Sequence, residues 1–104
     1  MKKQLIQSIP YEGLKNGTHL DTEVYYSKGG RGMFGGYSPR GYYVSVTPVK
    51  RSNGMVSFTL FTGASKLLLE TSRYSEKQFK QAVAVSEAVI PGLIERVLKQ
   101  ERAA

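Results

Sequence analysis

The chain has 104 residues, of which 40% are hydrophobic, 11% aromatic and 22% charged. This length and balance predict one soluble globular domain with its own hydrophobic core. Fifteen Lys and Arg stand against eight Asp and Glu, which gives a formal net charge of +7 and favours anionic partners such as nucleic acid. The chain has no Cys, which excludes disulfide scaffolds, zinc fingers and cysteine nucleophiles.

Residue types that carry catalysis or bind metals are scarce. His19 is the sole histidine and Asp21 the sole aspartate. A Ser-His-Asp triad would have to use both, although they lie only two residues apart. As metal ligands they share one side of a strand, and further ligands would have to come from Glu12 or Glu23. We therefore expect no enzyme activity, no cofactor and no metal site; a small enzyme or ligand-binding domain that uses His19 is a rival interpretation.

The N-terminal segment starts with Lys2 and Lys3, as a secretory signal would. Gln4, Gln7 and Ser8 interrupt the apolar run that such a signal needs. No segment has the length of a bilayer-spanning helix, and no basic amphipathic helix is evident. We expect a cytoplasmic protein that does not bind membranes.

Five segments have the composition of β-strands. In the strongest, Tyr42 and Val44 face one side while Tyr43 and Ser45 face the other, because side chains alternate along a strand. Pro48 predicts an edge position or the end of that strand, since Pro cannot donate a ladder hydrogen bond. The pair at 53–54, Asn-Gly, is typical of a type I′ hairpin turn. The predicted strands cover residues 3–9, 20–27, 41–50, 55–62 and 66–70.

A helix is predicted over residues 75–101. Ser75 and Gln78 have the spacing of a capping box, and Tyr74 and Phe79 flank it as a hydrophobic staple. The pair at 91–92, Pro-Gly, should kink the helix or split it. The inward stripe is predicted to contain Phe79, Ala82, Val83, Ser86, Ile90, Leu93, Ile94 and Val97. The predicted fold is α+β, an antiparallel sheet of four to five strands with a long, Pro-kinked C-terminal helix packed on one face.

The predicted helix is apolar over more than one face. Val85, Val89 and Leu98 widen its apolar arc to about 220°, whereas one core face needs little more than about 100°. Either the kink re-aims the second half so that both faces meet the same sheet, or these residues form a homodimer contact. We favour the homodimer.

Charge is unevenly distributed along the chain, because no Asp or Glu occurs between Val24 and Leu69. Cations attract phosphates, and flat rings stack unpaired bases at about 1–3 kcal/mol per base. If the helix covers one sheet face, Tyr43 and Phe61 lie on the other with several Ser and Thr. These residue types are also ordinary in strands. The predicted phosphate contacts are Lys28, Arg31, Arg40, Lys50, Arg51 and Lys66, and the predicted stacking residues are Tyr37, Tyr43 and Phe61.

Residues 28–41 hold six of the eleven glycines, so they predict a long mobile loop or an extended hairpin tip. Gly30 to Gly35 matches the G-x-G-x-x-G pattern, but Gly36 and Pro39 forbid the helix that a dinucleotide fingerprint requires. The run at 29–32, Gly-Gly-Arg-Gly, instead resembles Arg-Gly-rich segments that bind RNA or single-stranded DNA. A plain hairpin tip is the alternative.

From Arg40 onward the predicted order is strand, tight turn, strand, short strand and capped helix. Over residues 40–100 this pattern resembles the transcriptional-coactivator family of single-stranded-DNA-binding proteins, which pair a curved antiparallel sheet with a C-terminal helix and work as dimers. The resemblance implies that the bound DNA strand contacts the outward aromatics and three cations, Lys50, Arg51 and Lys66. It also implies that the helix forms the dimer interface. The whole chain also resembles small uncharacterised proteins of bacterial conjugative elements, which implies DNA handling by association only.

The predicted function is non-catalytic binding of single-stranded nucleic acid, DNA rather than RNA, in transcription or in the handling of mobile-element DNA. The alternative is a protein–protein interaction module, in which the wide apolar helix and the tyrosine-rich loop bind another protein.

Overall fold

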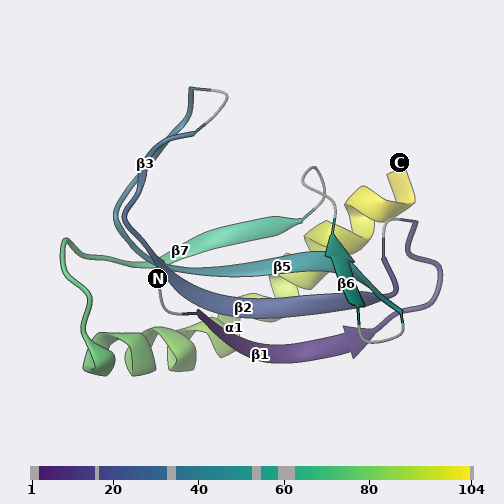
Figure 1. Ribbon diagram of the computed structural model, residues 1–104, viewed down its shortest axis with the longest axis horizontal. Coiled ribbons are helices and arrows are strands. Elements are labelled where there is room, and N and C mark those ends of the chain that lie inside the picture. Colours follow the sequence, from purple (N-terminus) through teal and green to yellow (C-terminus); the bar gives the residue numbers. More distant parts are fainter. Residues whose placement is uncertain (1–2, 16, 33–34, 53–54, 59–62, 104) are drawn as a thin grey trace.

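An antiparallel sheet carries one long helix on one face in the computed structural model of the protein (Figure 1). The structure describes residues 3–15, 17–32, 35–52, 55–58 and 63–103. This architecture confirms the predicted α+β class. The strands are β1 (Lys3–Pro10), β2 (His19–Ser27), β3 (Gly30–Arg31), β4 (Tyr37–Ser38), β5 (Gly41–Ser52), β6 (Met55–Phe58) and β7 (Ala64–Glu70), and the helix is α1 (Glu76–Ala103).

The main sheet has five strands in the order β1-β2-β5-β6, with β7 also paired to β5. Central strand β5 pairs with β7 as far as Val46 and with β6 from Val49 onward. Pro48 lies between these two pairings, opposite Leu20 of β2. Strand β5 continues past Pro48 to Ser52, so the alternative that Pro48 marks the strand's end is wrong. Among the described residues, neither β6 nor β7 pairs with β5 at Pro48, which is the unpaired side that the edge alternative requires.

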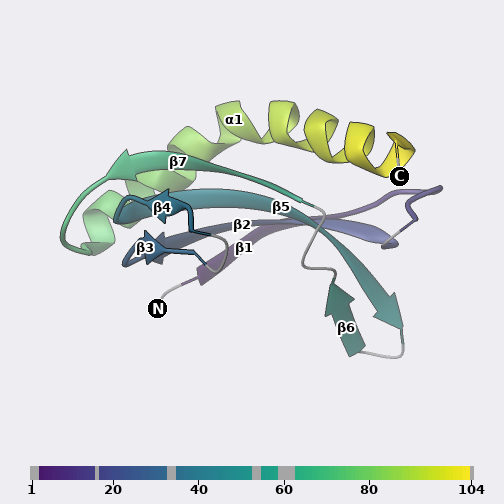
Figure 2. The same cartoon turned by 90° about the horizontal axis from the view of Figure 1, so that it is seen from above.

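The two faces of β5 differ in burial, as the alternation predicts. Tyr42, Val44 and Val46 are fully buried, whereas Tyr43 and Ser45 are only half-buried. Helix α1 packs on the buried side, against β5, β7 and β2 (Figure 2). The predicted inward stripe of the helix is confirmed: Phe79, Ala82, Ser86, Ile90, Leu93 and Val97 are buried, and Val83 and Ile94 are half-buried against them.

The start of α1 is capped and attached to the sheet. Ser75 Oγ accepts a hydrogen bond of 3.1 Å from the Gln78 backbone N–H, which is one half of the predicted capping box. Instead of the other half, the Ser75 N–H donates to the Tyr42 hydroxyl at 2.8 Å, and that hydroxyl donates to the Ser75 carbonyl at 3.0 Å. The staple forms as predicted, with ring centroids of Tyr74 and Phe79 6.0 Å apart. The cap thus positions the helix on β5.

Replacing Ser75 by Ala should lower the free energy of unfolding by about 1 kcal/mol, because the Gln78 N–H loses its acceptor. Urea denaturation followed by circular dichroism measures this loss. Ser75→Asp is the matched control, since it keeps an acceptor at the same place and should retain most of the stability. Equal losses in both variants would mean that the hydroxyl does not act as the cap.

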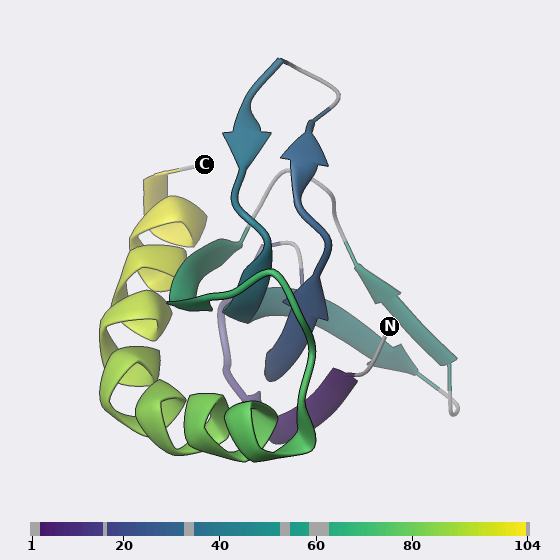
Figure 3. The ribbon, with the colours of Figure 1, turned by 90° about the vertical axis from the view of Figure 1, so that its left-hand side faces the viewer.

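Pro91 lies inside one continuous helix, so the predicted split into two pieces does not occur. The helix axis bends between its first and second halves (Figure 3), in keeping with the predicted kink. Of the three residues assigned to a dimer contact, Val89 and Leu98 pack against the core, and Val85 is 50% exposed. The curved packing therefore accounts for part of the wide apolar arc.

A hairpin, here called the arm and defined as residues 28–40 without 33–34, joins β2 to β5. It projects from the end of the sheet (Figures 1 and 3). Strands β3 and β4 pair within it, with Gly30 opposite Ser38 and Arg31 opposite Tyr37. Gly29 at its base has a φ of 70°, and a Cβ there would meet the Ser38 carbonyl oxygen. Of the two alternatives predicted for residues 28–41, a long mobile loop or an extended hairpin tip, the described part has the paired strands of a hairpin.

Candidate nucleic-acid interface

The outer face, meaning the side of the sheet opposite α1, extends from the arm at one end to the β5–β6 hairpin at the other (Figures 1 and 2). Residues that pair across antiparallel strands share a face, so the register places side chains on it in rows. One row crosses β1, β2, β5 and β7 as Lys3, Tyr25, Tyr43 and Leu67. The adjacent row, farther from the arm, is Leu5, Glu23, Ser45 and Ser65.

Two tyrosines form a stacked pair at the arm end of this face. The ring centroids of Tyr25 and Tyr43 are 5.7 Å apart, and their planes differ by 14°. The Tyr43 hydroxyl donates a 2.5 Å hydrogen bond to the Pro39 carbonyl at the base of the arm. Lys3 Nζ lies 5.8 Å from the Tyr25 ring centroid. Both rings are half-buried, so they are fixed in orientation and remain accessible from the outer face.

The surroundings of this pair oppose ionisation. Burial raises the pKa of Tyr25 above its ordinary 10.0, and the neighbouring Tyr43 and Glu23 raise it further. Burial likewise raises the pKa of Tyr43, with additional effects of Glu70 and Tyr37. Both phenols therefore stay neutral at physiological pH.

These shifts predict a loss of stability at alkaline pH. Because the folded protein holds the two phenol protons more tightly than the unfolded chain, their contribution is complete below pH 10.0 and is lost as the pH rises through the folded pKa values. Urea denaturation across this range should show the decline, and phenolate absorbance should show the late ionisation. In the Tyr25→Phe and Tyr43→Phe variants the decline should be shallower; an unchanged slope would contradict the assignment.

The arm gathers cations and one exposed ring. Lys28, Arg31 and Arg40 are exposed, and none of them forms an ion pair with any residue that the structure describes. Arg40 Nε donates to the Lys28 carbonyl at 3.2 Å, and Nη1 donates to the Ser72 carbonyl at 3.4 Å, so its side chain also braces the base of the arm. Tyr37 is 76% exposed. The arm presents positive charge next to an accessible aromatic surface.

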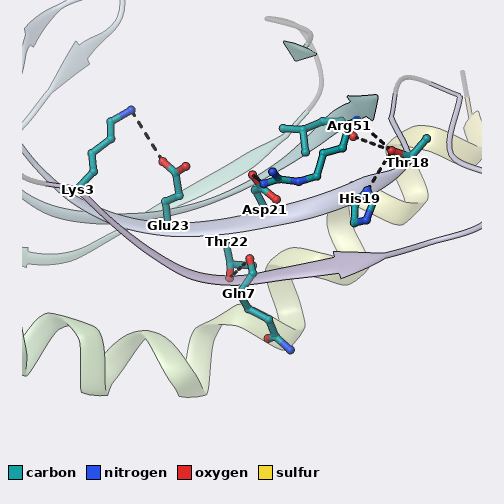
Figure 4. A network of polar contacts seen from close by, with 9 residues as sticks. Lys3, Gln7, Thr18, His19, Asp21, Thr22, Glu23 and Arg51 are labelled. Carbon is teal, nitrogen blue, oxygen red and sulfur yellow. Dashed lines mark hydrogen bonds and ion pairs between the residues drawn. The ribbon is translucent and has the colours of Figure 1, made fainter. Parts of the chain in front are cut away.

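The outer face also carries carboxylates that the acid-free stretch of sequence did not predict. Strand β2 lies beside β5 and places Asp21 opposite Thr47 and Glu23 opposite Ser45. Figure 4 shows both on the side away from α1. The buried Asp21 accepts a 2.6 Å hydrogen bond from Arg51, and this bond raises the pKa of Arg51. Arg51 is therefore committed to an ion pair rather than available as a phosphate contact.

The remaining predicted contacts do not join the arm. Lys50 is exposed at the far end of β5. Lys66 pairs with the buried Val44, which places it on the helix side of the sheet's edge. Phe61 lies outside the described residues. Of the nine predicted residues, the structure brings together Lys28, Arg31, Arg40, Tyr37 and Tyr43.

Sequence reasoning missed Tyr25 and Lys3 as members of this surface. The alternation in β2 indicated the position of Tyr25. Tyr25 and the half-buried Glu23 are two residues apart and share one side of the strand, whereas the buried Val24 between them faces the other side. The stacking of Tyr25 on Tyr43 depends on the pairing of β2 with β5, which no local pattern specifies.

Two further expectations from the sequence concern metal binding and membranes. His19 is half-buried, and its Nδ1 lies 3.0 Å from Thr18 Oγ1. Within the described ranges, no three His, Cys, Asp or Glu residues are grouped as metal ligands would be. The same part of the chain contains no helix with the length and apolarity needed to span a bilayer.

Comparisons of the chain with protein-family models, with curated proteins and with solved structures find no match. The surface must therefore be interpreted from its own geometry.

Proposed function

We propose that the protein binds single-stranded nucleic acid, DNA in preference to RNA, without catalysing a reaction. The observation that carries this proposal is the arm, where the exposed Arg31 lies directly opposite the exposed Tyr37. A guanidinium beside an accessible ring offers one group for a phosphate and one for a base. The Tyr25–Tyr43 pair lies at the base of the same arm, so the surface continues onto the sheet.

In this mechanism Lys28, Arg31 and Arg40 neutralise phosphates, and Tyr37 and Tyr43 stack on bases. Lys50 and Lys66 lie apart from the arm and contribute only longer-range attraction. Stacking on exposed rings needs the faces of bases, which a duplex hides within its own stack. The combination of a cationic ribbon and exposed rings therefore favours single strands.

The biological setting belongs to the same proposal. Transcription or the handling of mobile-element DNA, in the cytoplasm, would supply single-stranded DNA. We also propose a homodimer, for which the half-exposed Val85 is the contact candidate. Sedimentation equilibrium tests this part, because a mass equal to the monomer at working concentration would contradict it.

Fluorescence anisotropy tests the proposal, with a labelled twenty-base DNA strand, its duplex and the RNA equivalent, each at low and moderate salt. We expect micromolar or tighter binding to the DNA strand. The affinity should fall with salt by about 0.7 logarithmic units per phosphate contact for each tenfold increase.

Two other outcomes would contradict the proposal, and each would favour a different ligand. Tighter binding to the duplex would mean that the two-stranded arm enters a major groove instead. No binding at low salt, where electrostatic attraction is strongest, would remove nucleic acid as the ligand. The protein–protein interaction module would then be the better interpretation of the tyrosine-rich arm.

A further inference from the structure

The stacked pair Tyr25–Tyr43 has a carboxylate on each side along the strands. Glu23 precedes Tyr25 by two residues on β2 and lies in the adjacent row, away from the arm. Glu70 lies opposite Gly41, on the arm side of Tyr43. Both act on the pair electrostatically, since each raises the pKa of its neighbouring phenol. A nucleic-acid strand on this surface would therefore meet negative charge beside the rings.

Lys3 links Glu23 to the tyrosine pair. Its Nζ lies 3.9 Å from Glu23 Oε2 and 5.8 Å from the Tyr25 ring centroid. The Glu23 side chain is 31% exposed and that of Lys3 61% exposed. A long, exposed lysine side chain at this distance makes a weak ion pair and can move aside at little cost. The Glu23 carboxylate is therefore accessible from the outer face next to Tyr25.

The charges of this surface set the orientation of a bound strand. Phosphates are attracted to the arm, where Lys28 and Arg31 are free of carboxylates among the described residues. They are repelled from Glu23, which lies on the far side of the tyrosine pair. They are also repelled from Glu70, but Glu70 lies on β7 beside Tyr43, so the approach to the arm over Tyr25 on β2 stays open. A base stacked on the pair then has its sugar and phosphate toward the arm and its hydrogen-bonding edge toward Glu23.

A carboxylate accepts hydrogen bonds and cannot donate them. Cytosine presents an exocyclic amino donor, which Glu and Asp accept in base recognition, whereas thymine presents a carbonyl at the same position. Glu23 would attract the first group and repel the second. We propose that Tyr25, Tyr43 and Glu23 form a base-binding site that favours cytosine over thymine, an inference that rests on the proposed single-strand binding.

The test compares twenty-base oligo-dC and oligo-dT by fluorescence anisotropy at neutral pH and equal salt. We expect the wild-type protein to bind oligo-dC about three- to tenfold more tightly than oligo-dT. Glu23→Gln should bring this ratio close to one, because the amide both donates and accepts hydrogen bonds. The ratio is the readout, since removing a negative charge raises affinity for both oligonucleotides alike.

Two matched controls make the same charge change elsewhere. Glu70→Gln lies on the arm side of the pair, and Glu87→Gln lies exposed on α1; both should keep the wild-type ratio. Equal affinity of the wild-type protein for the two oligonucleotides, or a ratio that survives Glu23→Gln, would overturn the base-binding site and leave single-strand binding intact. Failure to bind either oligonucleotide at low salt would overturn the proposed function, and the base-binding site with it.

Discussion

Replacing Lys28 and Arg31 together by Gln should weaken binding of a twenty-base DNA strand by about tenfold or more at low salt. Each side chain is exposed on the arm and, in the described part of the chain, has no carboxylate partner, so its charge is available to a phosphate. Loss of two phosphate contacts should also reduce the logarithmic salt slope by about 1.4, at about 0.7 per contact. Anisotropy titrations over a salt series measure both quantities. Arg40 is kept because it braces the base of the arm through two carbonyls.

The matched control is the double variant Lys77→Gln and Lys80→Gln. Both lysines are exposed on α1, on the opposite side of the sheet from the outer face, so the control removes the same net charge from a surface outside the candidate interface. It should retain most of the affinity and the salt slope. Equal weakening in the two double variants would show that net charge alone attracts the strand and that the arm is not the interface. Thermal melting curves verify that both variants are folded.

Local patterns were sufficient to predict most of the fold. The alternation in β5 identified Tyr42 and Val44 as core residues, and the Ser75 cap placed the start of α1 within one residue. Pro48 does not end its strand, because tolerance of proline depends on which neighbours pair with the strand. Among the described residues, the two successive partners of β5 leave Pro48 unpaired on one side, and this arrangement is a property of the whole sheet.

The candidate site was predicted less completely, because it combines strands that are distant in sequence. No Asp or Glu occurs between Val24 and Leu69 in the sequence. In the sheet, however, β2 pairs with β5 and places Asp21 and Glu23 on the outer face, opposite Thr47 and Ser45. Arg51 forms an ion pair with Asp21, so its charge is not available to a phosphate. The arm differs because, in the described part of the chain, its two strands pair with each other and with no further strand, so its charge could be predicted from its own residues.

Neighbouring tyrosines on β5 should separate stability from binding. Tyr42 is fully buried beneath α1 and bonds the Ser75 backbone in both directions. Tyr42→Ala should therefore lower the free energy of unfolding by about 3–5 kcal/mol. Tyr42→Phe removes only the hydroxyl and should cost about 1–3 kcal/mol, because the Ser75 N–H is left without its acceptor. Urea denaturation measures both changes, and the milder variant keeps the comparison possible if the first does not fold.

Tyr43→Ala should weaken the binding of single strands more than it lowers the stability of the fold. Its ring lies half-buried on the outer face, stacked on Tyr25, so its removal should cost less stability than Tyr42→Ala while weakening binding of single strands by about 1–3 kcal/mol, the contribution of one stacked base. Anisotropy on the folded variant measures this change. A large loss of stability with unchanged affinity would mean that the pair serves to brace the arm through the Pro39 hydrogen bond. Because the two residues are adjacent in sequence and on opposite faces, a difference between their variants can be attributed to the face that each side chain occupies.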